Sequence, residues 1–236
     1  MRRILEIIRE VRALHPKDSF FCNFHESCRI PPKGTYYRAY NNALMWLDHE
    51  SWQILKEKAL KHYLGQREGQ TKQDFFNQLN EAFAYRYLAR MGLKKVRFVR
   101  ERRTKSPDIS FLNHQATQSY CEVKTLGISD DEIARRRSQK CFDLSVYLQL
   151  SDGFLRKFCG AVDAARQQIC AFGSQGLVYI IIRFDDLTLD NYRNYRRQLV
   201  AFCQKKGFDN LFIRIGLLGN RRICVRSRFA GHHDGT

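Results

Sequence analysis

The chain has 236 residues, of which 44% are hydrophobic and 13% aromatic, enough for a buried core, and this argues against disorder as the main state. No run approaches the roughly 18 consecutive apolar residues of a membrane-spanning helix, and residues 1–16 resemble an amphipathic helix more than a signal peptide. We therefore expect a cytoplasmic protein. Lysine and arginine total 41 against 24 acidic residues, a net charge of +17 that favours a polyanionic partner such as nucleic acid. A basic surface that is merely solvated is the alternative.

Residues 1–70 are predicted to form a mainly helical extension, with helices at 3–14 and 49–64. The stretch Arg29–Tyr37 contains two prolines and a glycine, and we expect it to interrupt regular structure. We predict that this extension takes part in recognising the target, because it carries both aromatic and basic residues.

Residues 71–236 are predicted to form a core domain that begins with a helix at 72–91. After this helix we expect strands at 95–100, 108–113 and 119–125, a helix at 153–172, a strand at 177–184, a helix at 189–206, and strands at 211–215 and 222–228. The apolar run at 177–184 is typical of a central strand. The predicted fold class is α/β, with a mixed central sheet flanked by helices and an α-β-β-β-α-β order through residue 184.

Three polar residues are predicted to gather on one face of the hairpin formed by residues 108–125. Side chains alternate along a strand, so Glu122 and Lys124 share the face opposite Cys121 and Val123, and Asp108 joins them from the preceding strand. An ordinary solvated hairpin face would also look like this.

These residue types suit the metal-assisted hydrolysis of a phosphodiester. Asp108 and Glu122 offer hard oxygen ligands to Mg²⁺ or Mn²⁺, and the backbone carbonyl of Val123 is placed to add another. Lys124 carries a charge that can orient the attacking water or stabilise the transition state.

The string Ser106-Pro107-Asp108, followed by Glu122-Val123-Lys124, resembles the signature of the PD-(D/E)xK nuclease superfamily, which includes restriction endonucleases and Holliday-junction resolvases. The helix from Glu81 to Gly92 is similar to the helix on which that superfamily carries a further glutamate. The resemblance covers about residues 71–185. It implies a restriction-endonuclease-like core, catalysis by Asp108, Glu122, Lys124 and Glu81, and Mg²⁺ as cofactor. By helical periodicity alone, Glu81 is equally well explained as a solvated side chain.

Other candidates surround this motif. Gln168 lies on the predicted helix 153–172, where the resemblance implies a polar residue facing the metal site, although a solvated glutamine is the alternative. The run Arg135, Arg136 and Arg137 follows the motif and is either a grip on flanking phosphates or a solvated helix face. Cys22, His25 and Cys28 have a spacing that suits zinc, but reduced, metal-free side chains explain them better.

The predicted function is thus a metal-dependent endonuclease acting on DNA, and a homodimer is compatible with cutting two strands. RNA as substrate, exonucleolytic cleavage and a non-cleaving nucleic-acid-binding protein with the same fold remain open. A protein whose charge serves a protein partner is a further alternative.

Overall fold

The computed structural model describes residues 1–65, 72–100, 105–127, 138, 147–173, 175–183, 191–218, 221–225 and 229. The chain divides into two compact units, Met1–Gln118 and Ser119–Thr236. The described residues form an α/β fold whose six-stranded mixed sheet has the order β1-β2-β3-β4-β5-β6. None of the described helices is long and apolar enough to cross a membrane.

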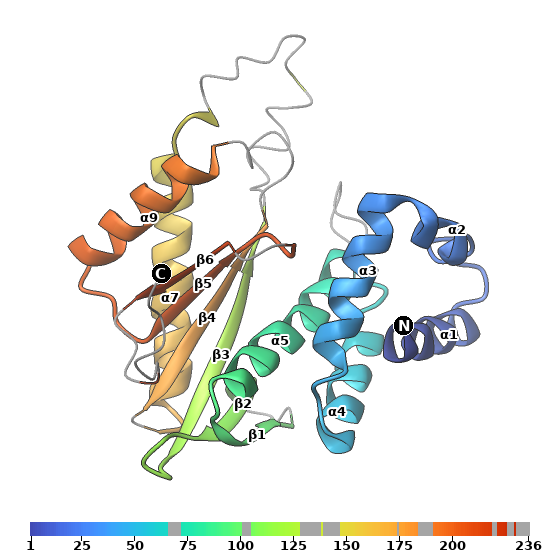
Figure 1. Ribbon diagram of the computed structural model, residues 1–236, viewed down its shortest axis with the longest axis horizontal. Coiled ribbons are helices and arrows are strands. Elements are labelled where there is room, and N and C mark those ends of the chain that lie inside the picture. The colour runs from blue at the N-terminus through green and yellow to red at the C-terminus, as the bar shows by residue number, and fades with distance from the viewer. Residues whose placement is uncertain are drawn as a thin grey trace. The chain divides into compact units, whose positions relative to one another are not determined.

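The first unit contains five helices and two strands in its described residues (Figure 1). They are α1 (Arg2–Leu14), α2 (Phe24–Arg29), α3 (Pro31–Leu44), α4 (His49–Lys61), α5 (Gln73–Arg90), β1 (Lys94–Phe98) and β2 (Ile109–Leu112). Helix α5 packs against α3, α4 and β1, and the buried side chains of Phe75, Leu79 and Phe83 lie on it. The site candidates Glu81 and Asp108 both belong to this unit, on α5 and immediately before β2.

The interruption that we predicted over Arg29–Tyr37 is confined to Ile30, which separates α2 from α3, and the prediction was wrong for the rest of the stretch, which is helical. Pro31 and Pro32 occupy the first positions of the helix, where a backbone N–H has no helical partner to lose. Gly34 permits a close approach, because a Cβ atom there would overlap the carbonyl oxygen of Cys28. The proline pair therefore starts a helix that packs on α5.

The second unit contains four strands and two helices in its described residues (Figure 1). They are β3 (Gln118–Leu126, whose first residue lies at the boundary), α7 (Asp152–Cys170), β4 (Gly176–Ile182), α9 (Tyr192–Lys205), β5 (Leu211–Ile215) and β6 (Arg222–Val225). Strands β3, β4 and β5 are parallel, and β6 is antiparallel to β5. Helix α7 begins at Ser151, whose hydroxyl accepts a hydrogen bond from the Phe154 N–H at 3.1 Å.

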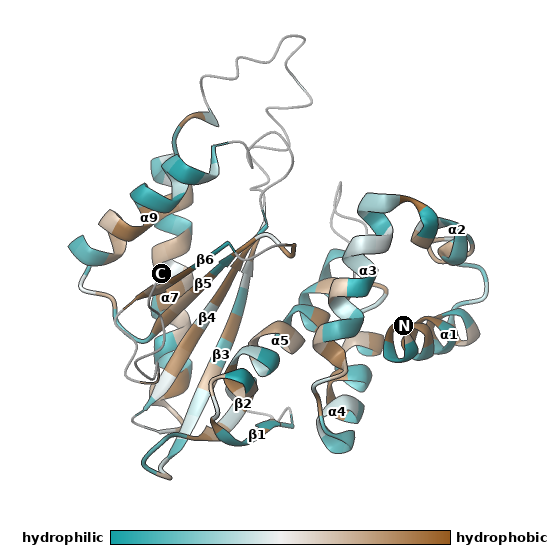
Figure 2. Cartoon of the chain, viewed as in Figure 1, coloured by the Kyte–Doolittle hydropathy of each residue, from teal (hydrophilic) through white to brown (hydrophobic). Residues whose placement is uncertain are grey.

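Strand β4 is central, as its apolar sequence predicted. It pairs with β3 on one side and β5 on the other, and it is mostly brown in Figure 2 because apolar residues fill it. Val178, Ile180 and Ile182 join a core cluster with residues of α7 and α9, so these helices cover one face of the strand. Tyr179 lies on the other face, where its ring stacks on Phe212 at 4.9 Å between centroids.

The predicted helices and strands of the core correspond to observed elements from α5 through β6. The predicted boundary at residue 70 separates an extension from a core domain, whereas the compact units divide the chain after Gln118 and place helices α1 to α5 together in the first unit. The boundary at residue 70 therefore stays a prediction.

Candidate functional site

Two of the predicted site carboxylates meet on one cation in the first unit. The ammonium nitrogen of Lys58 lies 2.7 Å from Oε1 of Glu81 and 2.8 Å from Oδ1 of Asp108. The side chains are 17% exposed for Lys58, 7% for Glu81 and 10% for Asp108. Helix α5 thus brings Glu81 inward, and the predicted alternative of a solvated glutamate is wrong.

The charge on Lys58 is maintained by these two neighbours. Burial alone would lower the pKa of a lysine, because it disfavours the charged form. Here the Coulomb attraction of Glu81 and Asp108, together with their hydrogen bonds, outweighs burial and raises the pKa of Lys58 well above its ordinary value. Lys58 is therefore a permanent cation at physiological pH.

Lys58 was not among the residues predicted for the site. A signal for it exists in the sequence, because it follows Ile54 by four positions and Leu55 by three, and these two residues are buried on α4. A lysine on the buried side of a helix needs an anionic partner. Nothing in the sequence pattern, however, identifies Glu81 and Asp108 as those partners.

The second unit places Glu122 and Lys124 on one face of β3, as alternation predicted. They pair in parallel register with Val178 and Ile180, two members of the core cluster beneath α7 and α9. Cys121 pairs with Leu177 and so takes the opposite face. Glu122 is 2% exposed. Its face of β3 is therefore not the ordinary solvated hairpin face that was the alternative explanation for this pattern.

Glu122 and Lys124 form an ion pair on this face. The Lys124 ammonium nitrogen lies 2.5 Å from Oε1 of Glu122, and the two side chains are 31% and 3% exposed. The carboxylate is thus enclosed while the ammonium is partly open to solvent. Such a pair can present a positive charge to a ligand from a fixed position.

The remaining predicted residues have different outcomes. Val123 is buried at 8% exposure, and its carbonyl oxygen stays a predicted ligand. Gln168 is half-buried on α7, the helix that covers the Glu122 face. The run Arg135, Arg136 and Arg137 lies outside the described residues.

The donors suit a hard divalent cation in chemical type. Carboxylate oxygens of Glu81 on α5 and of Asp108, just before β2, converge on one positive charge, which is the arrangement that such a cation also requires. Across the described ranges, no group of three or more histidine, cysteine, aspartate or glutamate side chains is placed to hold a metal. Mg²⁺ commonly uses only one or two protein carboxylates, so the pair is a sufficient donor set for it.

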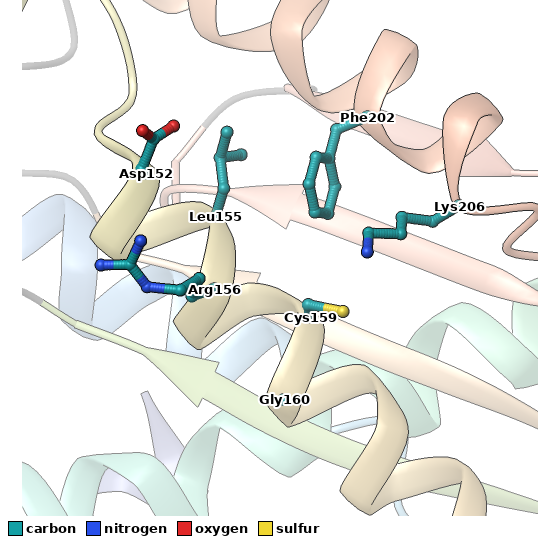
Figure 3. Close-up of a pocket in the computed structure, with 7 residues that line it drawn as sticks. All are labelled: Asp152, Leu155, Arg156, Cys159, Gly160, Phe202 and Lys206. Carbon is teal, nitrogen blue, oxygen red and sulfur yellow. The ribbon is translucent and has the colours of Figure 1, made fainter.

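A separate cavity of about 340 Å³ lies between α7 and α9 (Figure 3). Arg156 and Cys159 on α7, Phe202 on α9 and Lys206, which directly follows α9, are among the residues that line it. None of the residues predicted for the site is among them. Comparisons of the chain with protein-family models, with curated proteins and with solved structures gave no match.

Proposed function

We propose that this protein is a metal-dependent nuclease that hydrolyses phosphodiester bonds in DNA, with a restriction-endonuclease-like core. The observation that carries the proposal is the convergence of Glu81 and Asp108, two residues singled out from sequence, on the mostly enclosed ammonium of Lys58. Enclosing carboxylates and an ammonium is costly, and clusters of this kind are common at functional sites.

Asp108, Glu122 and the carbonyl of Val123 are the proposed metal ligands, and Glu81 is the proposed additional carboxylate. A bound Mg²⁺ supplies polarisation of the phosphate and a lower pKa for water. In the reaction, the oxygen of a water forms a bond to phosphorus while the bond to one ester oxygen breaks, and that oxygen leaves with a proton. Lys124, held on β3 by Glu122, stabilises the negative charge that develops on the phosphate.

The net charge of +17 supports a polyanionic substrate, and the buried Glu122 supports a role beyond surface solvation. The resemblance in residues 106–124, together with the α-β-β-β-α-β order of the described elements from α5 to β4, supports the finer assignment to the PD-(D/E)xK type. We place the activity on DNA and describe it as endonucleolytic.

The test is incubation of the whole chain with supercoiled, linear and branched DNA and with RNA, each with Mg²⁺, with Mn²⁺ and with a chelator. Nicking or linearising of closed circles with metal alone supports the proposal. Cleavage only from ends would identify an exonuclease instead of an endonuclease. Cleavage only of RNA would identify RNA instead of DNA as the substrate.

Glu122→Gln should abolish the cleavage, and Glu50→Gln is the matched control because Glu50 forms an exposed pair with Arg97 in the first unit. DNA binding without cleavage under all metal conditions would instead identify a binding protein that retains the fold.

A further inference from the structure

Lys58 occupies the position between two carboxylates at which a metal ion would also be held. Its nitrogen is within 2.8 Å of an oxygen from each of Glu81 and Asp108. Mg²⁺ binds carboxylate oxygens at about 2.0–2.1 Å. An ion bound to these two oxygens would therefore overlap the Lys58 ammonium in space, and the two positive charges would repel each other.

The lysine comes from outside the region that resembles the nuclease superfamily. Lys58 lies in the last turn of α4, within residues 1–70, whereas Glu81 and Asp108 lie within 71–185. The N-terminal helices therefore supply a cation to carboxylates of the predicted core. This role is separate from the target recognition predicted for residues 1–70.

We propose that Lys58 is a resident cation that holds the Glu81–Asp108 pair together in the metal-free protein and is displaced when a divalent metal binds there. This inference rests on the proposed function, in which Asp108 is a metal ligand and Glu81 is the additional carboxylate beside it. Lysine carries a compact charge on a flexible stem of four carbons, so it leaves the pair by side-chain rotation without movement of α4. Metal affinity is consequently lower than two paired carboxylates alone would provide.

The charge on Lys58 sets the size of the effect. An opposite charge within about 4–6 Å changes the affinity of a carboxylate for a proton by roughly ten- to a thousandfold, and a metal ion competes with the ammonium for the same oxygens. Removal of Lys58 should therefore raise the affinity for Mn²⁺ by about tenfold or more.

The first experiment is calorimetric titration of Mn²⁺ into wild type, Lys58→Met and Lys58→Gln, with Lys56→Met as matched control. Lys56 is also on α4 and also joins two carboxylates, Glu6 and Glu10, at 3.1 and 2.6 Å, but each of those is 38% exposed. We expect tighter Mn²⁺ binding in both Lys58 variants, a larger rise of their melting temperature with Mn²⁺, and no change in Lys56→Met. Unchanged or weaker binding in a folded Lys58 variant, or an equal gain in Lys56→Met, would overturn the proposal.

A second measurement uses the wild-type chain and does not depend on the variants folding. Amine acylation followed by peptide mass spectrometry should label Lys58 faster when Mn²⁺ is present at saturating concentration, because the displaced side chain reaches solvent. Labelling of Lys56 should stay the same. Equal labelling of Lys58 with and without Mn²⁺ contradicts displacement.

These readouts separate the inference from the proposed function. Tighter metal binding by the Lys58 variants with no cleavage of any nucleic acid would contradict the proposed nuclease function and support Lys58 as the resident cation. Cleavage that requires metal, with Lys58 labelling unaffected by Mn²⁺, would support the proposed nuclease function and contradict displacement of Lys58 by the metal.

Discussion

Lys124 and Glu122 divide enclosure and access between them. The carboxylate is 3% exposed and the ammonium 31%, so the negative end is fixed against the core while the positive end reaches the solvent. An ammonium cannot ligate a metal while charged. Its contribution to the proposed reaction is therefore electrostatic, and this separates its role from that of the carboxylates.

We predict that Lys124→Met lowers the single-turnover cleavage rate by about two to three orders of magnitude, the scale for removal of one electrostatic stabiliser, while metal and DNA binding remain. Asp108→Asn should lose both metal binding and cleavage, because it removes a ligand charge. Lys205→Met, an exposed lysine on α9, is the control and should cleave as wild type does. Full activity of Lys124→Met would remove this motif from consideration.

The positions of single site residues could be predicted from the sequence only in part. The sequence indicated Asp108, Glu122 and Lys124 through strand alternation and motif, and the alternation of Glu122 and Lys124 is confirmed. Their burial was not predictable, because alternation tells which face a residue takes and not what covers that face. For the same reason Lys58 was missed: its partners lie 23 and 50 positions away along the chain.

At the scale of elements, periodicity predicted the strongly patterned segments and failed where one residue type has two uses. Strand β4 and helices α5 and α7 follow from long apolar patterns, and Ser151 caps the start of α7, whereas α5 begins without a side-chain cap hydrogen bond. Helix α3 does not, because proline both ends helices and starts them, and only packing on α5 decides between these uses. Helix α2 has only the six residues Phe24–Arg29, too few for periodicity to reveal.

The start of α5 depends on an ion pair with the segment after α1. Lys72 is 1% exposed, and its ammonium nitrogen lies 2.5 Å from Oδ2 of Asp18 and 3.9 Å from the centre of the Tyr63 ring. We predict that Asp18→Asn lowers the free energy of unfolding by about 3 kcal/mol, because it leaves a buried ammonium without its carboxylate. Chemical denaturation measures the loss. Glu50→Gln, which breaks a pair with side chains 61% and 56% exposed, should cost under about 1 kcal/mol.

The same pair gives a pH dependence of known sign. The hydrogen bond from Lys72 is the main reason that the pKa of Asp18 lies below its ordinary value. A carboxyl group with a lowered folded pKa stabilises the fold above its unfolded pKa of about 3.9, and this contribution is lost as pH falls through the folded value. The stability difference between wild type and Asp18→Asn should therefore be constant near neutrality and shrink below about pH 4. A difference that persists unchanged in acid would show that the carboxylate charge is not responsible.

At the scale of the whole molecule, the helices before residue 70 are integrated with α5. The ring of Phe21 meets that of Phe75 at 5.9 Å between centroids, and the Tyr40 hydroxyl donates a 2.8 Å hydrogen bond to Asn80. We predict that a fragment of residues 71–236 loses cooperative unfolding, because its α5 would expose the apolar side chains that α3 and α4 cover. Circular dichroism during heating, compared with the full chain, measures this. A sharp transition and retained cleavage would instead confirm the predicted boundary at residue 70.

The net charge of the chain also makes a prediction about its partner. A chain with 41 basic and 24 acidic residues that binds duplex DNA releases counterions from the phosphates it contacts. The logarithm of the binding constant should therefore fall linearly with the logarithm of salt concentration, with a slope of about −0.9 for each phosphate contacted. We expect a slope of about −4 or steeper for duplex DNA, measured by fluorescence anisotropy. A flat plot would indicate a protein partner for this charge.

The slope also decides the role of the arginine run at 135–137, which the sequence leaves open. Joint substitution of Arg135, Arg136 and Arg137 by alanine should make the slope shallower by up to about 2.7 if each side chain contacts one phosphate. Binding should weaken by a similar factor for every DNA sequence, since phosphate contacts carry no sequence information. The matched control replaces Arg193, Arg196 and Arg197 by alanine, which removes the same number of charges from α9. Equal changes of slope in both triple variants would mean that overall charge, and not a phosphate grip beside the motif, governs the affinity.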